Sequence, residues 1–358
     1  MAVEKISRKI KGGGTMRILI DINHPADVHQ FKNVIKEMSR QGHKFRVIAR
    51  DKECTHELLR QNKIKFVARP GYKGMMKLYG MARISQIIVR EAKKFQPDVL
   101  VGSSGDLYIA QASQLLGKPS IIFDDTEHST IQNWLTFPFA TKVVTPKSYT
   151  LDLGKKQIRY DGFKELAYLH PGYFKPNPKI HRLLRVKPNE PFILLRFVSW
   201  DASHDIGKNG ISDKIAFVSK LASKFRVFIS SESELPEAIR KYQLGRAKGQ
   251  IHSVLHSARL VISEGGTTAA EAAILGTPTI YVNPLKMGYT NELIGKYGLL
   301  EQITEQGKIL KRAESIMKNQ GLRESWKKKR DKLVQDKVDT TKFYIKTIKE
   351  MAKRRSGK

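Results

Sequence analysis

The sequence predicts an α/β protein of two tandem, doubly wound parallel-sheet domains with a cleft between them. Its 358 residues suggest about two domains, at roughly 150 residues per domain. Short apolar runs alternate with stretches of helical periodicity, which is typical of strands covered by helices on both faces. A passage with three prolines at residues 171–178 interrupts this alternation once, as a linker between domains would.

The expected domain boundaries follow from these features. Residues 1–15 are basic, end near three glycines and lack the apolar centre of a signal peptide, so we expect a flexible leader outside the fold. Residues 16–172 should form an N-terminal domain and residues 173–330 a C-terminal domain. Residues 331–358 should form a basic helix that packs back toward the N-terminal domain.

Apolar runs and periodic segments locate the expected elements of the first half. Strands are expected at residues 17–21, 45–49, 65–67, 98–101, 120–123 and 141–145. Helices are expected at residues 31–40, 57–61, 75–95 and 107–116.

The same pattern restarts after the proline-rich passage. Strands are expected at residues 192–196, 226–229, 260–262 and 279–282. Helices are expected at residues 213–223, 251–256 and 268–275 and over most of 315–351. Ligands of open α/β sheets bind beyond the carboxyl ends of the strands, so the cleft between the domains is the expected site.

Charge and cysteine content narrow the function classes. Lys and Arg number 65 against 34 Asp and Glu, a net charge of +31. This surplus attracts anions such as nucleic acid, an acidic membrane face or phosphorylated small molecules, although a solvated lysine-rich surface is the alternative. The single cysteine, Cys54, excludes an internal disulfide and a thiolate zinc site. With no apolar run of about 18 residues, we expect a cytoplasmic protein, soluble or peripheral on the inner face of the cell membrane.

The strongest local signal lies at residues 260–278, LVISEGGTTAAEAAILGTP. A buried strand leads through Gly265 and Gly266 into a short alanine-rich helix. The glycines permit close approach of a ligand, and the N–H groups of the helix start suit a phosphate or diphosphate. The alternative is a capping box that needs no ligand, with Thr268 as N-cap and Glu271 three residues later. Neither a P-loop nor a complete Gly-x-Gly-x-x-Gly pattern is present.

Residues 263–278 resemble the donor-site motif of glycosyltransferases of the GT-B superfamily, and look especially like the peptidoglycan N-acetylglucosaminyltransferases that form lipid II. A closer resemblance is to a domain-of-unknown-function family of archaea and bacteria within that superfamily. This resemblance is also carried by residues 20–33, IDINHPADVHQFKN, and spans Met16 to about Glu350. It implies two Rossmann-like domains and the transfer of a sugar from a nucleotide.

The resemblance also implies donor-binding residues. The diphosphate would be held by Gly265, Gly266, Thr267 and Thr268. Glu271 would accept hydrogen bonds from the ribose hydroxyls, and the backbone around Ile251 would read the uracil edge. A loop beginning at Ser199 would face the diphosphate, although it carries Trp200 and His204 where the superfamily has a short Gly-Gly-Ser type of loop.

In the first half, the turn after the first strand is the place where the superfamily often holds a catalytic base. His24 and His29 flank this turn, and the near-neutral pKa of histidine suits general-base work. Asp27 is the rival candidate, and a helix cap or a surface position is the alternative for the histidines. The expected acceptor-binding residues, which could instead form ordinary polar turns, are Ser103, Ser104, Gly105, Asp125, Glu127 and His128.

A mixed apolar and basic segment, residues 72–83, could rest on anionic lipid headgroups or could be an ordinary helix facing the core. The predicted function is therefore an inverting, metal-independent glycosyltransferase without a cofactor. It would use a nucleotide-diphosphate sugar, of UDP type, and a lipid-linked or membrane-proximal acceptor. One alternative is a non-hydrolysing UDP-sugar 2-epimerase. A second is a nucleic-acid-binding protein, which no RNA-recognition or helix-turn-helix pattern supports.

Overall fold

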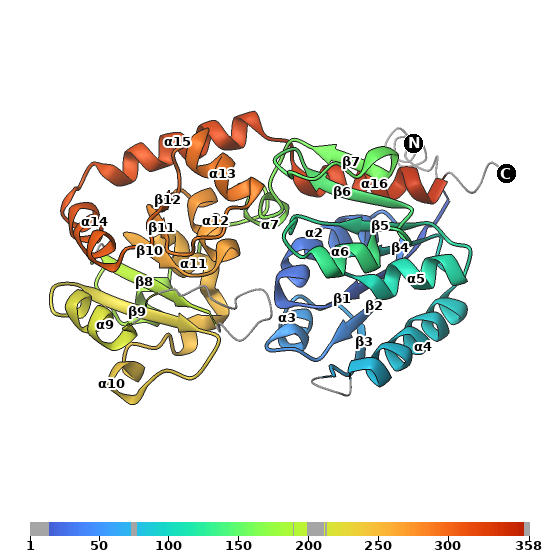
Figure 1. Ribbon diagram of the computed structural model, residues 1–358, viewed down its shortest axis with the longest axis horizontal. Helices are drawn as coiled ribbons and strands as arrows, with labels where there is room; N and C mark the ends of the chain where they lie inside the picture. The colour runs from blue at the N-terminus through green and yellow to red at the C-terminus, as the bar shows by residue number, and fades with distance from the viewer. Residues whose placement is uncertain (1–13, 73–76, 189, 199–210, 212, 354–358) are drawn as a thin grey trace, which may run out of the picture. The chain divides into compact units, whose positions relative to one another are not determined.

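The computed structural model describes residues 14–72, 77–188, 190–198, 211 and 213–353, and the chain divides into two compact units (Figure 1). Unit 1 is drawn from Met1–Lys147, Leu151–Tyr160 and Asp339–Lys358. Unit 2 is drawn from Ser148–Thr150 and Asp161–Val338. Each unit contains one open sheet.

Unit 1 is built on a seven-stranded sheet in the order β3-β2-β1-β4-β5-β6-β7. The strands are β1 (Arg17–Ile22), β2 (Lys44–Arg50), β3 (Phe66–Arg69), β4 (Val99–Gly102), β5 (Ser120–Phe123), β6 (Lys142–Pro146) and β7 (Gln157–Tyr160). All neighbouring strands pair in parallel. The predicted doubly wound fold class is therefore confirmed for this unit.

Helices cover both faces of the first sheet, which explains why its strands are apolar on both sides. The helices of this unit are α2 (Pro25–Arg40), α3 (Thr55–Gln61), α4 (Lys77–Phe95), α5 (Leu107–Leu115), α6 (Thr130–Thr136) and α16 (Thr340–Lys353). Ile88 of α4 and Ile109 of α5 pack on one face with Leu19 of β1. Phe31 of α2 and Tyr344 of α16 meet Phe123 of β5, with ring centroids 5.8 and 4.1 Å from that of Phe123.

Unit 2 is built on a five-stranded sheet in the order β12-β11-β10-β8-β9. The strands are β8 (Phe192–Phe197), β9 (Arg226–Ser231), β10 (Leu260–Ser263), β11 (Thr279–Tyr281) and β12 (Glu301–Gln302). These strands are also all parallel, as predicted. The helices are α7 (Leu166–Leu169), α8 (Ile180–Leu184), α9 (Lys214–Ala222), α10 (Glu237–Arg240), α11 (Ile251–Ser257), α12 (Gly266–Ile274), α13 (Gly288–Gly295), α14 (Gln306–Lys318) and α15 (Leu322–Asp336).

Apart from the short stretch Ser148–Thr150, the crossing from unit 1 to unit 2 lies earlier than the boundary expected at residue 172. Unit 2 takes over at Asp161, directly after β7. The reason is α7, whose buried Tyr168 donates a hydrogen bond to Glu271 at 2.7 Å. The proline-rich passage lies within unit 2, where the Asn177 N–H donates to Ser253 Oγ at 3.1 Å.

The chain returns to unit 1 near its end. The sequence predicted helix over most of residues 315–351, whereas the structure has a break between α15 in unit 2 and α16 in unit 1. The break follows Lys337, a buried lysine whose Nζ lies 2.5 Å from carboxylate oxygens of both Asp161 and Glu292. These two ion pairs anchor the end of α15 in unit 2.

The sequence analysis did not predict several elements of eight residues or fewer, namely α6, α7, α8, α10, α13, β7 and β12, whose short sequences carry weak periodicity, and it missed most of α14. Helix α2 also begins at Pro25 rather than at residue 31, because proline is tolerated in a first helical turn and His24 and Asp27 cap that turn. In the described part of the chain, no helix combines the length and the apolar character that a membrane crossing requires.

Candidate functional site

Each sheet has one point at which the direction of strand order reverses, and ligands of open α/β sheets bind at such points. In unit 2 the reversal falls between β8 and β10, and in unit 1 between β1 and β4. The residues that follow these four strands are therefore the first candidates for a site.

In unit 2, helix α12 begins directly after β10 at this reversal point. Gly265 is its N-cap, with φ −94° and ψ 128°, and Gly266 is its first helical residue. No side chain caps the helix start. Within the described residues, the N–H groups of Gly266, Thr267 and Thr268 have no hydrogen-bond acceptor. These half-buried positions therefore present unsatisfied amides and the positive end of the helix dipole.

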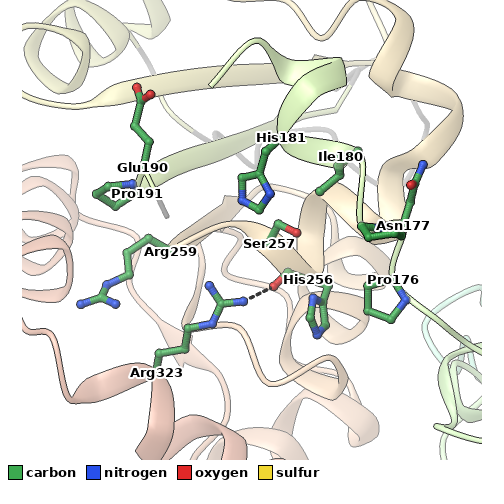
Figure 2. Close-up of a pocket in the computed structure, with 11 residues that line it drawn as sticks. Pro176, Asn177, Ile180, His181, Glu190, Pro191, His256, Ser257, Arg259 and Arg323 are labelled. Atoms are coloured by element: carbon green, nitrogen blue, oxygen red, sulfur yellow. Dashed lines mark hydrogen bonds between the residues drawn. The ribbon is translucent and has the colours of Figure 1, made fainter. Parts of the chain in front are cut away.

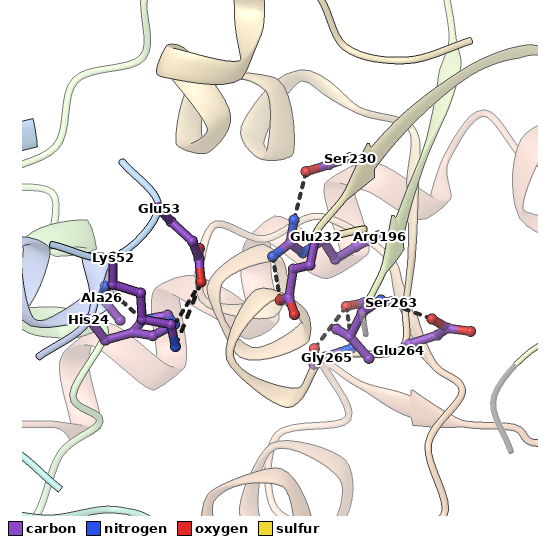
Figure 3. A network of polar contacts seen from close by, with 11 residues as sticks. His24, Ala26, Lys52, Glu53, Arg196, Ser230, Glu232, Ser263, Glu264 and Gly265 are labelled. Carbon is purple, nitrogen blue, oxygen red and sulfur yellow. Dashed lines mark hydrogen bonds and ion pairs between the residues drawn. The ribbon is translucent and has the colours of Figure 1, made fainter. Parts of the chain in front are cut away.

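The alternative capping-box interpretation of this segment is wrong. Thr268 lies in the first turn of α12 and is not its N-cap, because the helix begins at Gly266. The local turn is fixed instead by Ser263, whose Oγ donates to the Gly265 carbonyl at 2.8 Å and accepts from the Gly265 N–H at 3.1 Å (Figure 3).

The backbone at Gly266 is closely approached by two side chains. A Cβ atom at this position would lie 2.5 Å from Met287 Cε and 2.6 Å from Tyr289 Oη. Glycine therefore lets these two side chains approach the backbone at the helix start, and any larger residue would force them away.

The buried carboxylate of Glu264 joins the neighbouring strand to this turn. Its Oε2 accepts from the Val198 N–H at 2.9 Å, and its Oε1 accepts from the Ile211 N–H at 3.1 Å. Val198 and Ile211 flank residues 199–210, so one side chain holds the chain on both sides of that segment. Ser199, predicted to contact the donor, lies outside the described residues, as do Trp200 and His204.

Glu271 is buried and bound by the protein itself. Its Oε1 accepts from the Tyr168 hydroxyl at 2.7 Å and lies 3.0 Å from His252 Nε2. Burial alone would raise the pKa of Glu271, but His252, through its charge and its hydrogen bond, and the hydrogen bond from Tyr168 lower this pKa below its ordinary value. The predicted ribose contact would have to use Oε2. Ile251, whose backbone was predicted to contact the uracil base, is the first residue of α11 and directly precedes His252.

At the reversal point of unit 1, the start of α2 is closed by side chains. His24 Nδ1 accepts from the Ala26 N–H at 3.2 Å, and Asp27 Oδ2 accepts from the N–H groups of Asn23 and His24, both at 2.9 Å. His24 Nε2 also lies 3.8 Å from Glu53 Oε1 (Figure 3). Two of the three predicted catalytic residues therefore have helix-capping contacts.

His29, the third predicted catalytic residue, lies on α2 just beyond this capped turn. It is half-buried, and its Nδ1 lies 3.3 Å from Lys32 Nζ. Because an ammonium can only donate, the Lys32 side chain would donate a hydrogen bond to this ring nitrogen.

The predicted acceptor residues after β4 and β5 are partly brought together. Ser104 Oγ donates to Asp125 Oδ1 at 3.3 Å, and the Thr126 hydroxyl donates to the same carboxylate oxygen at 3.2 Å. Ser103, which precedes Ser104, is buried, and Gly105 has a left-handed φ of 70°. Glu127 and His128 lie half-buried in the turn that leads to α6. The cluster contains one carboxylate joined to hydroxyls, which suits a hydroxyl-rich ligand.

The sequence analysis missed a buried ion pair at the carboxyl ends of β1 and β3. Arg69, at the end of β3, donates to Asp21 Oδ1 at 3.0 Å and to Asp21 Oδ2 at 2.7 Å. The same guanidinium also donates to Asn23 Oδ1. Asp21 ends up fully buried at the carboxyl end of β1, where an unpaired carboxylate would be costly.

Asp106 is the second missed residue. Its Oδ1 caps α5 by accepting from the Ile109 N–H at 3.1 Å, and its Oδ2 is buried without a hydrogen-bond partner among the described residues. Burial and the charge of Asp21 raise the pKa of Asp106 well above its ordinary range, against the opposing charge of Arg69. A Cβ at Gly102 would lie 2.6 Å from Asp106 Oδ2, so glycine is needed there. A raised pKa favours the protonated form of this carboxyl, and that form can donate a hydrogen bond or a proton.

The sequence carried a signal for Asp106 but none for the pairing of Arg69. Asp106 precedes the helix predicted at residues 107–116, where an aspartate is a common cap. Arg69 follows an apolar run, but nothing in its local sequence names Asp21 as the partner 48 positions away. Among the described residues, no three His, Cys, Asp or Glu side chains are arranged to share a metal ion.

Comparison with known proteins now places this chain. It belongs to the family described as "Protein of unknown function (DUF354)", whose model matches residues 16–352. The uncharacterized protein MJ0665 of Methanocaldococcus jannaschii is 25% identical over 295 residues, covering 78% of this chain and 85% of that protein. Membership of a domain-of-unknown-function family, predicted from residues 20–33 and 263–278, is thereby confirmed.

Solved structures of two kinds share the fold. The UDP-GlcNAc 2-epimerase of Neisseria meningitidis, bound to UDP-GlcNAc, aligns with a TM-score of 0.69 at 13% identity, covering 93% of this chain and 99% of that one. The glycosyltransferase SsfS6 of Streptomyces sp. SF2575 aligns with a TM-score of 0.59 at 13% identity, covering 93% and 99%. The two parallel-sheet domains that the sequence predicted for this chain are thus confirmed as its fold.

Proposed function

We propose that this member of the DUF354 family is an enzyme that binds a nucleotide-diphosphate sugar, of UDP type, with the diphosphate at the start of α12. The observation that carries the proposal is the helix start at Gly265–Thr268, which lies at the strand-order reversal of unit 2 and whose amides have no acceptor among the described residues. The Neisseria structure that shares the fold holds UDP-GlcNAc, which supports a ligand of this class.

The chemistry proposed for this site is cleavage of the bond between the anomeric carbon and the diphosphate. The anomeric carbon develops oxocarbenium character, and the leaving diphosphate gains negative charge. Amides fixed at the helix start are oriented before the reaction begins, so they can stabilise that charge without reorganising. The expected contacts are the N–H groups of Gly266, Thr267 and Thr268, with no metal ion required for them to act.

We further propose transfer of the sugar, with inversion, to an acceptor that binds unit 1 near Ser104 and Asp125. If the acceptor is a hydroxyl, His29 is the favoured base, because His24 and Asp27 are engaged in capping α2. If the acceptor is a lipid phosphate, it is already ionised and needs no base.

A lipid-linked acceptor is supported by the surface of α6, which follows the Asp125–His128 turn. Ile131 and Trp134 on this helix are 77% and 75% exposed. The Lys156 ammonium lies beside the end of the same helix, 3.3 Å from the Phe137 carbonyl oxygen. Exposed apolar side chains next to lysines suit the surface of an anionic membrane.

A 2-epimerase is the second candidate, and Asp106 is the observation that favours it. Inverting C2 of a sugar requires one group that removes a proton and another that returns it on the opposite face. A buried carboxyl with a raised pKa suits the returning group. An epimerase converts its donor without any acceptor, whereas a transferase does not.

The test is a thermal-shift panel of UDP, GDP and dTDP with their sugar conjugates, followed by incubation of the best ligand alone. We expect UDP or a UDP-sugar to raise the melting temperature and the sugar to remain unchanged without acceptor. Conversion of the sugar in the absence of acceptor would select the epimerase. No stabilisation by any nucleoside diphosphate would overturn both candidates.

A further inference from the structure

Unit 2 contains a pocket at the amino ends of its strands, whereas the start of α12 lies at their carboxyl ends. Pro191 directly precedes β8 and Arg259 directly precedes β10, so the pocket lies at the amino ends of these parallel strands (Figure 2). Its volume is about 480 Å³, and His256 at the end of α11 and Arg323 in the first turn of α15 also line it. This volume is large enough for a small organic ligand.

The two arginines of the pocket have no carboxylate partner among the described residues. Arg259 donates one hydrogen bond, to the Asn319 carbonyl oxygen. Its Nε is buried and has no acceptor in the described part of the chain. Arg323 donates to the His256 carbonyl oxygen at 2.7 Å. Among the described residues, the terminal nitrogens of the two guanidinium groups make only these two hydrogen bonds, so a ligand can supply further acceptors there.

The one acidic lining residue, Glu190, is engaged elsewhere. Its Oε1 lies 3.2 Å from Arg226 Nε, and its Oε2 accepts from the Lys187 N–H at 2.9 Å. Figure 2 shows its carboxylate pointing away from Arg259 and Arg323. The positive charge of the two arginines is therefore not neutralised from within the pocket.

The neighbouring groups respond to this uncompensated charge. Partial removal from water and the proximity of Arg259 lower the pKa of Arg323. Burial, together with the charges of Arg323 and Arg330, lowers the pKa of His256 to about 4. His256 is thus neutral near pH 7, and the pocket concentrates positive charge from the two guanidinium groups.

We propose that this pocket is a second ligand site that binds a small organic phosphate monoester, whose phosphate is held by Arg259 and Arg323. Guanidinium groups match phosphate oxygens in geometry and charge. The space beside Pro191 and Ile180 accepts the organic part. Because the pocket lies at the amino ends of the strands and the start of α12 lies at the carboxyl end of β10, both sites can be occupied at the same time.

The experiment titrates the full-length protein with glycerol 3-phosphate and with inorganic phosphate by calorimetry, at constant ionic strength set with chloride. The test variants are Arg259→Gln and Arg323→Gln. The matched control is Arg240→Gln, which removes the same kind of charge at an exposed arginine of unit 2 that Glu237 already pairs at 2.7 Å. We expect the Kd for glycerol 3-phosphate to rise at least tenfold in each test variant and to stay unchanged in the control.

Two further readouts keep the inference falsifiable if a test variant folds poorly. Arg259→Lys should retain part of the affinity, and saturating glycerol 3-phosphate should raise the pKa of His256, measured by NMR, because a bound anion offsets the nearby arginines. Equal affinity in the control and both test variants would overturn the proposal. So would loss of binding in Gly266→Ala alone, which would place the phosphate at the start of α12, or the absence of saturable binding.

Discussion

The first turns of α2 and α12 occupy equivalent places, each after a central strand at the reversal point of a parallel sheet, yet they differ in what satisfies their amides. In α2, His24 and Asp27 accept from backbone N–H groups around the helix start. In α12, glycines stand at the N-cap and first position, and no side chain caps the helix. The difference is that the protein itself completes the first helix start, whereas the start of α12 is left for the diphosphate that we propose binds there.

The protein also fills the carboxyl end of the strand that precedes α2. The carboxyl end of β1 is filled by the ion pair of Asp21 with Arg69, both of which are buried. The largest expected effect comes from breaking this pair. Arg69→Met should lower the free energy of unfolding by about 3–5 kcal/mol, because it leaves a buried carboxylate unpaired. Urea unfolding measures this loss.

Arg90→Met is the matched control for that measurement. Arg90 is exposed and lies 3.6 Å from Glu91, and such surface pairs contribute about 0–1 kcal/mol. If Arg69→Met lowered the free energy of unfolding as little as this control, the Asp21–Arg69 ion pair would not stabilise the fold. The claim that the protein itself completes the carboxyl end of β1 would then be contradicted.

The caps themselves provide the next test. Asp27→Ala should cost about 1–2 kcal/mol of stability, since it removes the acceptor for two backbone N–H groups. Thr268→Ala should cost less than about 0.5 kcal/mol, since Thr268 is not a cap. Equal losses in the two variants, measured by chemical denaturation, would mean that α12 is capped by its own side chain after all.

A glycine substitution tests the ligand half of the comparison. Gly266→Ala places a Cβ 2.5 Å from Met287 Cε and should weaken UDP binding about tenfold, or about 1.4 kcal/mol. Gly307→Ala in the first turn of α14 is the control, because the nearest atom to its Cβ lies 3.7 Å away. Calorimetric titration should show full UDP affinity in the control, and a similar loss in both variants would argue against binding at α12.

The smallest effect concerns Glu271 and pH. Because its folded-state pKa lies below its ordinary value of 4.5, its ionised form stabilises the fold above that pH. This contribution should disappear as the pH falls from about 4.5 through the folded-state pKa. Glu271→Gln should flatten the stability profile in that window, and parallel profiles for the two proteins would contradict the assignment.

The sequence predicted the fold well because the buried strands of both sheets are short and apolar, as parallel strands covered on both faces must be. The start of α12 was also visible, because two glycines between an apolar run and an alanine-rich stretch have few other uses. The position of its first residue was less secure, since Thr268 and Glu271 also have the spacing of a capping box. The structure distinguishes the two, because the helix begins at Gly266 and Glu271 is bound by Tyr168 and His252.

Contacts between distant positions account for what the sequence could not predict. Arg69 and Asp21 meet because β3 and β1 end at the same sheet edge, and Tyr168 reaches Glu271 from a short helix 103 positions earlier. The main crossing from unit 1 to unit 2 differs from the expected boundary for the same reason, because α7 packs with α12. Neither local periodicity nor residue type encodes such pairings.

The most direct test of the central claim follows the backbone amides themselves. Amide NMR spectra of the full-length protein recorded during a UDP titration should show saturable shifts for Gly266, Thr267 and Thr268. The Ala26 and Asp27 amides in the first turn of α2 should not move. If UDP bound while the three α12 amides stayed in place, the claim that this helix start is completed by a diphosphate would be contradicted.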